Sequence, residues 1–562
     1  MLAVRYLVLP HVNEWRPQIE RQVSASLGVS LTIGEIAASW SGISPTLTVD
    51  RVEVKDKQGL VLLSIPKAHA VVSWRSLFLL QPRFAFLELT GVNLRATRHE
   101  NGELSIAGKR LDGQSASKHD SMFDIPAVNW LLKQNKIVLH DASFEWQDTL
   151  RRAPDLVLRN IDVAVENGLV SHRFLVSVDP PGDLGERLEL VIRSDDIINN
   201  LGAGTHANRQ AEVYLLLQDF EPSAWAPWVD LPYDFSGRYS LRVWSDLVKG
   251  KLTHTTVDFA GNQAGRPALA GTGLGGNVAR FSMRMTGWVG DILPADVALG
   301  LFEHSPEFSG ININLSAAGV KLETDLFDPS LIELDTLSAE LLLKRSASGL
   351  YGVTLNSMNL ANPELRASLQ GSWRQDKHLA AGVAQLQGSL NQVDATRLYK
   401  YLPVSIERDT RQWFHDSITQ GLFPQVSFLV NGNLDEFPFN TPGSTGRFQL
   451  NGPFKNLTVD YAPGTNDEEG WPPLIEMNGT LSIDKMALNI RADSGMVTDL
   501  KGVRIPFQNL IARIPDMDLD PVLTLTAGLR GEAGQVLNLA RSTALDEYVG
   551  EYIEGVVATG IV

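Results

Sequence analysis

The run Ile311-Asn312-Ile313-Asn314-Leu315-Ser316-Ala317 alternates apolar and polar residues without interruption. Successive side chains of a β-strand point to opposite faces, so the isoleucines and Leu315 would share one face and their polar neighbours the other. The same alternation recurs in Val426 to Val430 and in Leu523 to Leu529, near Gly, Asn or Pro at the ends. This pattern predicts half-apolar strands through most of the chain.

The composition of the chain limits its class. With 562 residues, of which 44% are apolar, it can bury a large core and is not expected to be disordered. A net charge of -16 argues against nucleic acid or an anionic bilayer surface as the main partner, because most of the surface would repel either one. The absence of cysteine excludes disulfides, thiolate nucleophiles, iron–sulfur clusters and cysteine-type zinc sites.

No motif in the sequence predicts catalysis. The glycines from Gly271 to Gly276 satisfy G-x-G-x-x-G, but they lie between two strand-like segments and are interpreted as a hairpin turn. The sequence contains no G-x-S-x-G, P-loop or H-E-x-x-H, and its eleven histidines are scattered. The acidic runs Asp195-Asp196 and Asp467-Glu468-Glu469 lie in loop-like surroundings. We therefore expect no catalytic residue, no metal site and no cofactor.

The periodicity changes at a few places. Residues Asn13 to Gly28 carry apolar residues at helical spacing with Pro17 in the first turn, which predicts a helix. Residues 109–122 are predicted to form a polar loop, and Ile125 to Gln134 a short helix. Two further short helices are expected between Asn391 and Gly421: one with Val393, Leu398 and Tyr401, and a second with Trp413 and Ile418 that ends at Gly421. The predicted segments are a membrane-proximal segment and helix (1–28), an N-terminal β repeat (29–108), a loop and short helix (109–136), a β body (137–390), a helical insert (391–421), a continuation of the β body (422–533), and a helix with the start of a further, truncated repeat (534–562).

The first residues of the chain are apolar. A membrane span needs about 20 such residues, and the run from Met1 to Pro10 is shorter and has no small-residue cleavage site. We interpret the run as the outer end of a membrane span whose beginning is missing, and the alternative is an ordinary first β-strand. The membrane-proximal candidates are Leu2, Val4, Leu7, Val8 and Leu9.

One stretch resembles a known repeat. Leu87 to Ile106 contains a strand, Gly91, a second strand that ends in basic residues, and an Asn101-Gly102 turn into a third strand. This order resembles the AsmA-like repeat. The chain is most similar to the YhdP branch of that family, through Leu9-Pro10-His11, Trp15-Arg16-Pro17, His140 to Trp146, Gly452-Pro453-Phe454, Trp471-Pro472-Pro473 and Gly502-Val503-Arg504.

The resemblance implies a periplasmic protein of the bacterial envelope that is anchored in the inner membrane. Such a protein conducts phospholipids toward the outer membrane along a β-sheet groove, without catalysis and without a cofactor. The implied partners are phospholipids, the inner membrane at the N-terminus, and the outer membrane or envelope proteins at the far end. The resemblance supplies no catalytic residues, so the protein is not expected to be an enzyme.

The predicted fold is mostly β, an elongated, curved antiparallel sheet forming a groove, with short helical inserts and an N-terminal helix. Two alternatives remain: an envelope scaffold of closed β-sandwiches that conducts no lipid, and an envelope hydrolase, for which no carboxylate pair or Ser/His set can be placed. From alternation alone, the candidates for lining the groove are Ile311, Ile313, Leu315, Val426, Phe428, Val430, Leu523, Leu525 and Leu529.

Overall fold

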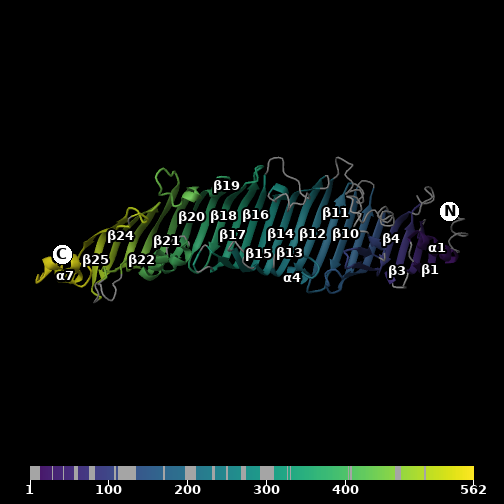
Figure 1. Ribbon diagram of the computed structural model, residues 1–562, viewed down its shortest axis with the longest axis horizontal. Helices are drawn as coiled ribbons and strands as arrows, with labels where there is room; N and C mark the ends of the chain where they lie inside the picture. The colour runs from purple at the N-terminus through teal and green to yellow at the C-terminus, as the bar shows by residue number, and fades with distance from the viewer. Residues whose placement is uncertain are drawn as a thin grey trace. The chain divides into compact units, whose positions relative to one another are not determined.

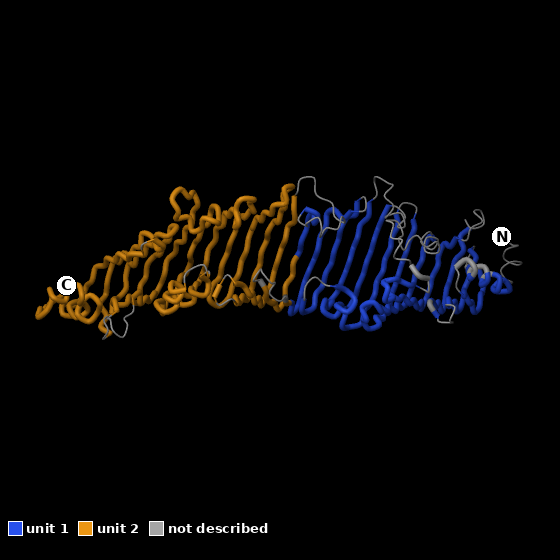
Figure 2. The backbone as a smooth tube through the Cα atoms, in the orientation of Figure 1, with its two compact units in different colours: residues 1–264, 284–306 blue, residues 265–283, 307–562 orange. Residues whose placement is uncertain are grey.

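The fold is seen in a computed structural model, in which the chain groups into two compact units. Unit 1 comprises Met1–Ala264 and Arg284–Pro306, and unit 2 comprises Gly265–Met283 and Glu307–Val562. Figure 2 colours unit 1 blue and unit 2 orange. The structure describes residues 13–27, 30–41, 44–55, 61–74, 83–106, 109–111, 134–168, 171–195, 210–230, 235–248, 251–266, 274–291, 309–325, 327–328, 331–402, 404, 408–462, 470–498, 502–519 and 521–562.

Unit 1 begins with a helix and continues as a series of strands, as the alternating sequence predicts. Strands β14 (Lys251–Arg266) and β15 (Leu274–Trp288) contribute residues to both units. The other elements of unit 1 are α1 (Arg16–Leu27), β1 (Ser30–Ser41), β2 (Ser44–Lys55), β3 (Val61–Val72), β4 (Phe84–Thr90), β5 (Asn93–Arg98), β6 (Leu104–Ile106), β7 (Lys109–Leu111), β8 (Lys136–Asp148), β9 (Leu156–Asn167), β10 (His172–Asp179), β11 (Arg187–Ser194), β12 (Gln210–Phe220), α4 (Pro222–Trp225), β13 (Ser236–Val248) and η6 (Val289–Asp291).

Most strands of unit 1 pair antiparallel with their neighbours in the chain: β1 to β4 in order, and β8 to β13 in order. Strand β8 is the exception, because it runs parallel to both β4 and β5. The chain passes through β6 and β7 before it reaches β8, which gives the long crossover that a parallel pair requires. The prediction of a mostly antiparallel sheet is confirmed, with this local exception.

Unit 2 consists of long strands interrupted by short helices. Figure 1 shows its strands lying side by side in chain order. Its elements are β16 (Ile311–Thr324), β17 (Leu331–Arg345), β18 (Tyr351–Ala361), β19 (Arg366–Asp376), β20 (Leu379–Asp394), η7 (Ala395–Tyr401), α6 (Arg408–Ser417), β21 (Ile418–Asn433), η8 (Leu434–Glu436), β22 (Arg447–Val459), β23 (Leu474–Asp484), β24 (Ala487–Thr498), β25 (Arg504–Ile514), β26 (Thr524–Leu529), α7 (Ala533–Arg541) and α8 (Asp546–Ile553).

Each strand from β16 to β26 pairs antiparallel with the next. Within the described part of unit 2 the strands therefore form one sheet, and no second sheet covers it to make a sandwich. The mostly β, antiparallel fold class predicted from the sequence is confirmed.

Bulges interrupt the alternation at defined points of unit 2. Asn456 and Asn509 have positive φ, and the strand register shifts beside each of them. The extra residue lets Phe507 and Leu510, three positions apart, both be buried at 1% exposure. Asparagine suits these positions because it tolerates the left-handed conformation better than most residues. The bulges keep the apolar residues on one face where strict alternation would divide them between two faces.

The predicted helices are present, with corrected ends. Helix α1 lies within the helix predicted from Asn13 to Gly28, and the segment after residue 533 forms α7 and α8. The helical insert is η7 followed by α6. Its predicted limits were wrong by a few residues, because Val393 is hydrogen-bonded within β20 and Ile418 begins β21. Backbone pairing with the adjacent strands includes these two residues, so the helical segment between them is shorter than predicted.

Several predictions fall outside the described residues. They are the apolar segment from Met1 to Leu9, most of the polar loop predicted over 109–122 and nearly all of the short helix predicted from Ile125 to Gln134. The first three residues of that loop are described, and the prediction is wrong there, because Lys109–Leu111 form strand β7 paired with β6. The glycine-rich motif is described only from Leu274 onward. There it begins strand β15 and not a helix, as the hairpin interpretation requires.

Candidate functional site

Apolar side chains of unit 2 form two continuous rows across seven strands. Residues that are register partners on adjacent strands project from the same face of the sheet, so a chain of partners defines a row. The two rows together are named the open band. The first consists of Ile313, Leu341, Leu355, Gly371, Leu386, Val430 and Phe448, and the second of Leu315, Ala339, Met358, Leu369, Gly388, Phe428 and Leu450.

Side chains of the open band are mostly half-buried. Ala339, at 8% exposure, is its one buried member, and none of its large apolar residues is buried or fully exposed. Gly388 leaves room for the ring of Phe428, since a Cβ on Gly388 would lie 2.7 Å from that ring. The band is therefore a closely packed apolar surface that still contacts solvent. Such a surface can bind an apolar ligand without unfolding.

A second set of apolar residues on the same face is fully buried. It is named the covered band, and it includes Phe423 at 5% exposure, Phe454 at 1%, Leu457 at 3%, Met477 at 2% and Phe507 at 1%. Phe423 and Phe454 meet edge to face, with ring centroids 6.3 Å apart. The covered band is the hydrophobic core of unit 2.

The helical inserts cover this core. Leu398 and Tyr401 of η7, Phe414 of α6 and Val536 of α7 pack against the covered band. The sequence predicts such helices because apolar residues recur there at helical spacing and need a partner surface. The inserts therefore divide one apolar face into a covered band and an open band.

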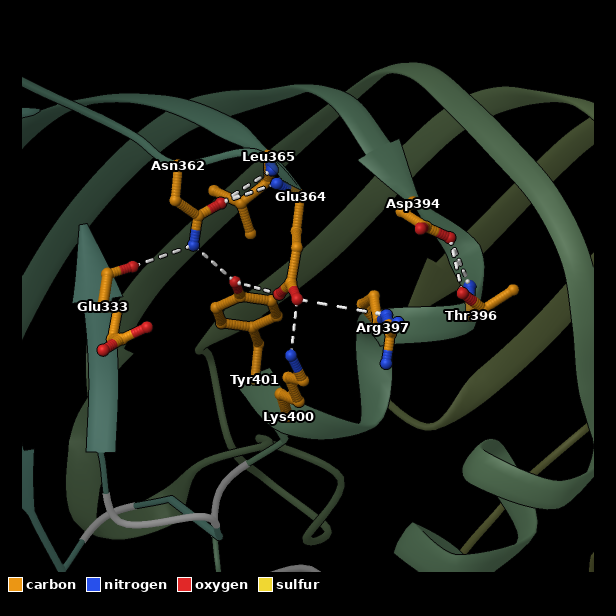
Figure 3. Close-up of polar contacts among 9 residues, drawn as sticks. All are labelled: Glu333, Asn362, Glu364, Leu365, Asp394, Thr396, Arg397, Lys400 and Tyr401. Atoms are coloured by element: carbon orange, nitrogen blue, oxygen red, sulfur yellow. Dashed lines mark hydrogen bonds and ion pairs between the residues drawn. The ribbon is translucent and has the colours of Figure 1, made fainter. Parts of the chain in front are cut away.

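A polar cluster fixes η7 to the turn between β18 and β19, as Figure 3 shows. The Glu364 carboxylate accepts a hydrogen bond of 2.8 Å from the Tyr401 hydroxyl and pairs with the Lys400 ammonium group. Asn362 donates to the Tyr401 hydroxyl at 2.7 Å, and its carbonyl oxygen accepts from the backbone N–H groups of Glu364 and Leu365. These bonds hold the insert at one place on the sheet.

The first turn of η7 is held by a side-chain cap. Asp394 caps η7 by accepting hydrogen bonds from the backbone N–H of Thr396 at 2.9 Å and from the Thr396 hydroxyl at 2.7 Å.

Burial of the Tyr401 side chain raises the pKa of its hydroxyl to about 12. Ionisation would place a phenolate in a poorly hydrated site beside the Glu364 carboxylate. The hydroxyl therefore stays protonated and remains a hydrogen-bond donor.

Unit 1 repeats the apolar rows on its own sheet. One row runs through Leu47, Ala70, Leu87, Ile137, Val165, Phe174 and Ile192, and a second through Val49, Ala68, Leu89, Leu139, Val163, Val176 and Leu190. The first row includes buried residues, among them Val165 at 3% exposure, and half-buried ones such as Phe174. Each unit thus has one apolar sheet face.

The structure places eight of the nine predicted lining residues in strands of unit 2. Ile313, Leu315, Phe428 and Val430 belong to the open band and are half-buried. Ile311 and Val426 are on the same face but are buried, at 2% and 5% exposure. Leu525 and Leu529 are partners of Ala512 and Phe507, so they share that face near its C-terminal end, whereas Leu523 precedes strand β26 and is 39% exposed. The five membrane-proximal candidates, Leu2, Val4, Leu7, Val8 and Leu9, lie outside the described residues.

Sequence reasoning missed most members of the open band outside strands β16 and β21. Among the missed residues are Leu341, Leu355, Leu386, Phe448 and Leu450. Leu386 and Phe448 lie in segments where apolar and polar residues alternate, so the same period-2 pattern could have identified them. Leu355 and Met358 are three positions apart on one face, so only the bulge between them reveals the pairing.

A metal site and a membrane-spanning helix each place requirements on the described residues. Among the residues that the structure describes, no three His, Asp or Glu side chains come close enough together to hold a metal ion. None of the described helices is both long enough and apolar enough to cross a membrane.

The YhdP protein family model matches residues 1–270 and 295–562, which is most of the chain. The chain belongs to the YhdP family. A curated relative, the intermembrane phospholipid transporter YhdP of Escherichia coli (strain K12), is 33% identical over 91 residues. That alignment covers 16% of this chain and 7% of the relative, so the match spans only a small part of the relative's length. No solved structure matches this member of the YhdP family.

Proposed function

We propose that this YhdP-family chain transfers phospholipids between membranes of the bacterial envelope and that the open band contacts their acyl chains. The single observation that carries the proposal is the pair of in-register apolar rows, half-buried and uninterrupted by charge across seven strands. Membership in the family, with a curated relative named as an intermembrane phospholipid transporter, supports the choice of lipid.

The transfer of a phospholipid through water needs such a surface. Each methylene group exposed to water costs about 0.8 kcal/mol, so two acyl chains with roughly 30 methylenes would cost about 24 kcal/mol. An apolar band removes most of this cost while the headgroup stays hydrated at its edge. Because successive positions of the band are chemically alike, no single position would hold the lipid tightly.

The size of the open band fits an acyl chain. Seven strands spaced at about 4.8 Å give a band of about 29 Å. The hydrocarbon core of a bilayer is about 30 Å thick and contains two layers of chains, so one acyl chain spans roughly half of that thickness. A chain could therefore lie along the rows and move by one strand at a time without leaving apolar contact.

The proposed conduit is not an enzyme and needs no cofactor. We place it in the periplasm, held at the inner membrane through its N-terminal end, with the outer membrane or an envelope protein as the acceptor. The apolar N-terminal run and the family membership support this placement. A scaffold function would need the apolar face to be closed by another sheet, and the described strands of unit 2 supply none.

Site-specific photo-crosslinking in cells tests the proposal. Probes at Ile313 and Val430 should capture phospholipid, because both side chains lie in the open band. Probes at Asn312 and Asn431, the adjacent residues on the opposite face, are matched controls and should capture none. Equal lipid capture at the two pairs of positions, or capture at neither pair, would reject the open band as the lipid path.

A further inference from the structure

The opposite face of the unit 2 sheet carries a row of small uncharged polar residues. Register partners place Ser316, Ser338, Asn359, Ser368, Ser389 and Ser427 in line across six consecutive strands. Two of them bond to each other, since the Ser368 hydroxyl donates to the Asn359 side-chain oxygen at 2.8 Å. This row crosses the strands on the far side of the sheet from the open band.

Two adjoining hollows lie along this row. The first has a volume of about 530 Å³, and ten of its fourteen lining residues are Asn, Gln or Ser, with none charged. The second has a volume of about 760 Å³, and Asn359 and Ser368 line both hollows. Small side chains such as Ser316, Ala318 and Ser338 leave this space above the backbone. The hollows therefore belong to one continuous polar depression.

Both charged residues that line the depression are arginines, and one acidic residue lies beside it, because Glu340 accepts a hydrogen bond of 3.5 Å from the lining residue Asn356. Its lining includes Arg280 and Arg366 but no Asp or Glu. Neither arginine forms an ion pair with a described residue. This is unusual for a chain with a net charge of -16, whose sheet elsewhere pairs its charges across strands, as at Lys136 and Glu166, 2.8 Å apart. The two arginines can therefore form charge-assisted hydrogen bonds with a negatively charged group of a polar ligand.

Several polar side chains in the depression have unused hydrogen-bonding capacity. Gln370, Gln387, Ser316 and Ser338 line it and make no side-chain hydrogen bond to another described residue. An amide offers two donors and one acceptor group, and a hydroxyl can donate and accept. A ligand rich in hydroxyl and amide groups, which also donate and accept, complements this surface better than an apolar or purely anionic ligand does.

We propose that this depression binds an extended glycan that carries carboxylate or phosphate groups. The sugars of an extended β-1,4-linked chain repeat at nearly the strand spacing of about 4.8 Å, so successive sugars can face successive strands. The Asn, Gln and Ser side chains would bond the sugar hydroxyl and acetamido groups, and Arg280 and Arg366 would bind the anion. Binding here would fix the sheet to a polysaccharide while the open band stays free. This inference does not rest on lipid transfer.

Isothermal titration of the purified chain with two hexasaccharides tests this. One is the neutral β-1,4-linked oligomer of N-acetylglucosamine, and in the other alternate sugars are N-acetylmuramic acid, which carries a carboxylate. We expect both to bind and the acidic one to bind more tightly. The double variant Arg280→Ala/Arg366→Ala should weaken the acidic ligand about tenfold, an effect of about 1.4 kcal/mol, and leave the neutral one unchanged.

A second variant and a control separate the glycan from a free anion. Gln370→Leu/Gln387→Leu should weaken both hexasaccharides by a similar factor. Arg193→Ala, which removes an arginine paired with Glu212 on the unit 1 sheet, should change neither. Absence of binding by both hexasaccharides, identical binding by wild type and the two double variants, or full competition by inorganic phosphate alone would overturn the proposal. Photo-crosslinking of lipid in the open band is expected to be the same in all variants.

Discussion

Strand β22 carries Phe448 and Phe454 on the same face of one sheet, yet the two rings lie in different environments. Phe448 belongs to the open band and is half-buried. It packs against the exposed ring of Phe437, with the two ring centroids 5.1 Å apart. Phe454 belongs to the covered band and is 1% exposed. The sequence alternation around both is similar. What differs is that helical inserts pack against the covered band, and this cover separates the core from a surface that remains available for a ligand.

The largest expected effect tests this division directly. Phe454→Ala removes a buried ring and should lower the free energy of unfolding by about 3–5 kcal/mol. Phe448→Ala, the matched change in the open band, should cost only about 1–2 kcal/mol because that side chain is already partly solvated. Urea unfolding of the two variants measures the difference. Equal losses of stability would show that the two bands are a single core.

A charge in the open band should affect lipid passage more than stability. Acyl chains must pass every position of the band. A charged side chain there would lose its water when an acyl chain moved past it, and this desolvation would cost several kcal/mol. Ile313→Arg, Phe428→Asp and Val430→Asp should therefore reduce lipid transfer by tenfold or more, with protein level and thermal midpoint close to wild type. Asn431→Asp, on the opposite face and outside the polar depression, is the control. Loss of the protein along with its function would instead favour a closed structural core.

The polar cluster that fixes η7 should contribute a smaller amount. Tyr401→Phe removes the hydrogen bond to Glu364 and leaves Asn362 with one fewer partner, which should cost about 1 kcal/mol at neutral pH. The folded-state pKa of Tyr401 is raised to about 12 from 10.0, so its contribution is complete below pH 10 and is lost as the pH rises toward 12. Denaturant unfolding at a series of pH values from about 8 to about 12 should show the stabilities of wild type and Tyr401→Phe converging. A constant difference would contradict this assignment.

The smallest expected effect is in unit 1, where Arg95 and Glu145 face each other on parallel strands, 2.6 Å apart. The hydrogen bond from Arg95 holds the pKa of Glu145 below its usual 4.5. The pair therefore stabilises the fold above pH 4.5, and this contribution disappears as the pH falls through the lowered pKa. Because both side chains are about one-third exposed, the contribution should be only about 0.5–1 kcal/mol. Glu145→Gln should remove this acid dependence from urea unfolding curves, and an unchanged dependence would assign it to other carboxylates.

Alternation was sufficient for a large part of the fold. It located the strands around Ile313 and Phe428 and placed them on a common face, because a period of two fixes which side chains point together. Helical spacing likewise located α1 and the insert that contains Leu398 and Trp413. The ends of that insert were missed because hydrogen bonding to neighbouring strands extends β20 and β21 further than the sequence indicates.

Local periodicity is enough to establish a mostly β chain with one apolar and one polar face per strand. Which apolar residues are buried in the core and which stay open to solvent depends on the tertiary structure. Ile311 and Ile313 are equivalent in the alternation, yet one is 2% exposed and the other is half-buried. The bulges at Asn456 and Asn509, the cover by η7 and α6, and the alignment of Ser316 with Ser427 across the sheet all depend on residues distant in sequence. Burial is a property of what packs on a side chain, and local sequence does not contain that information.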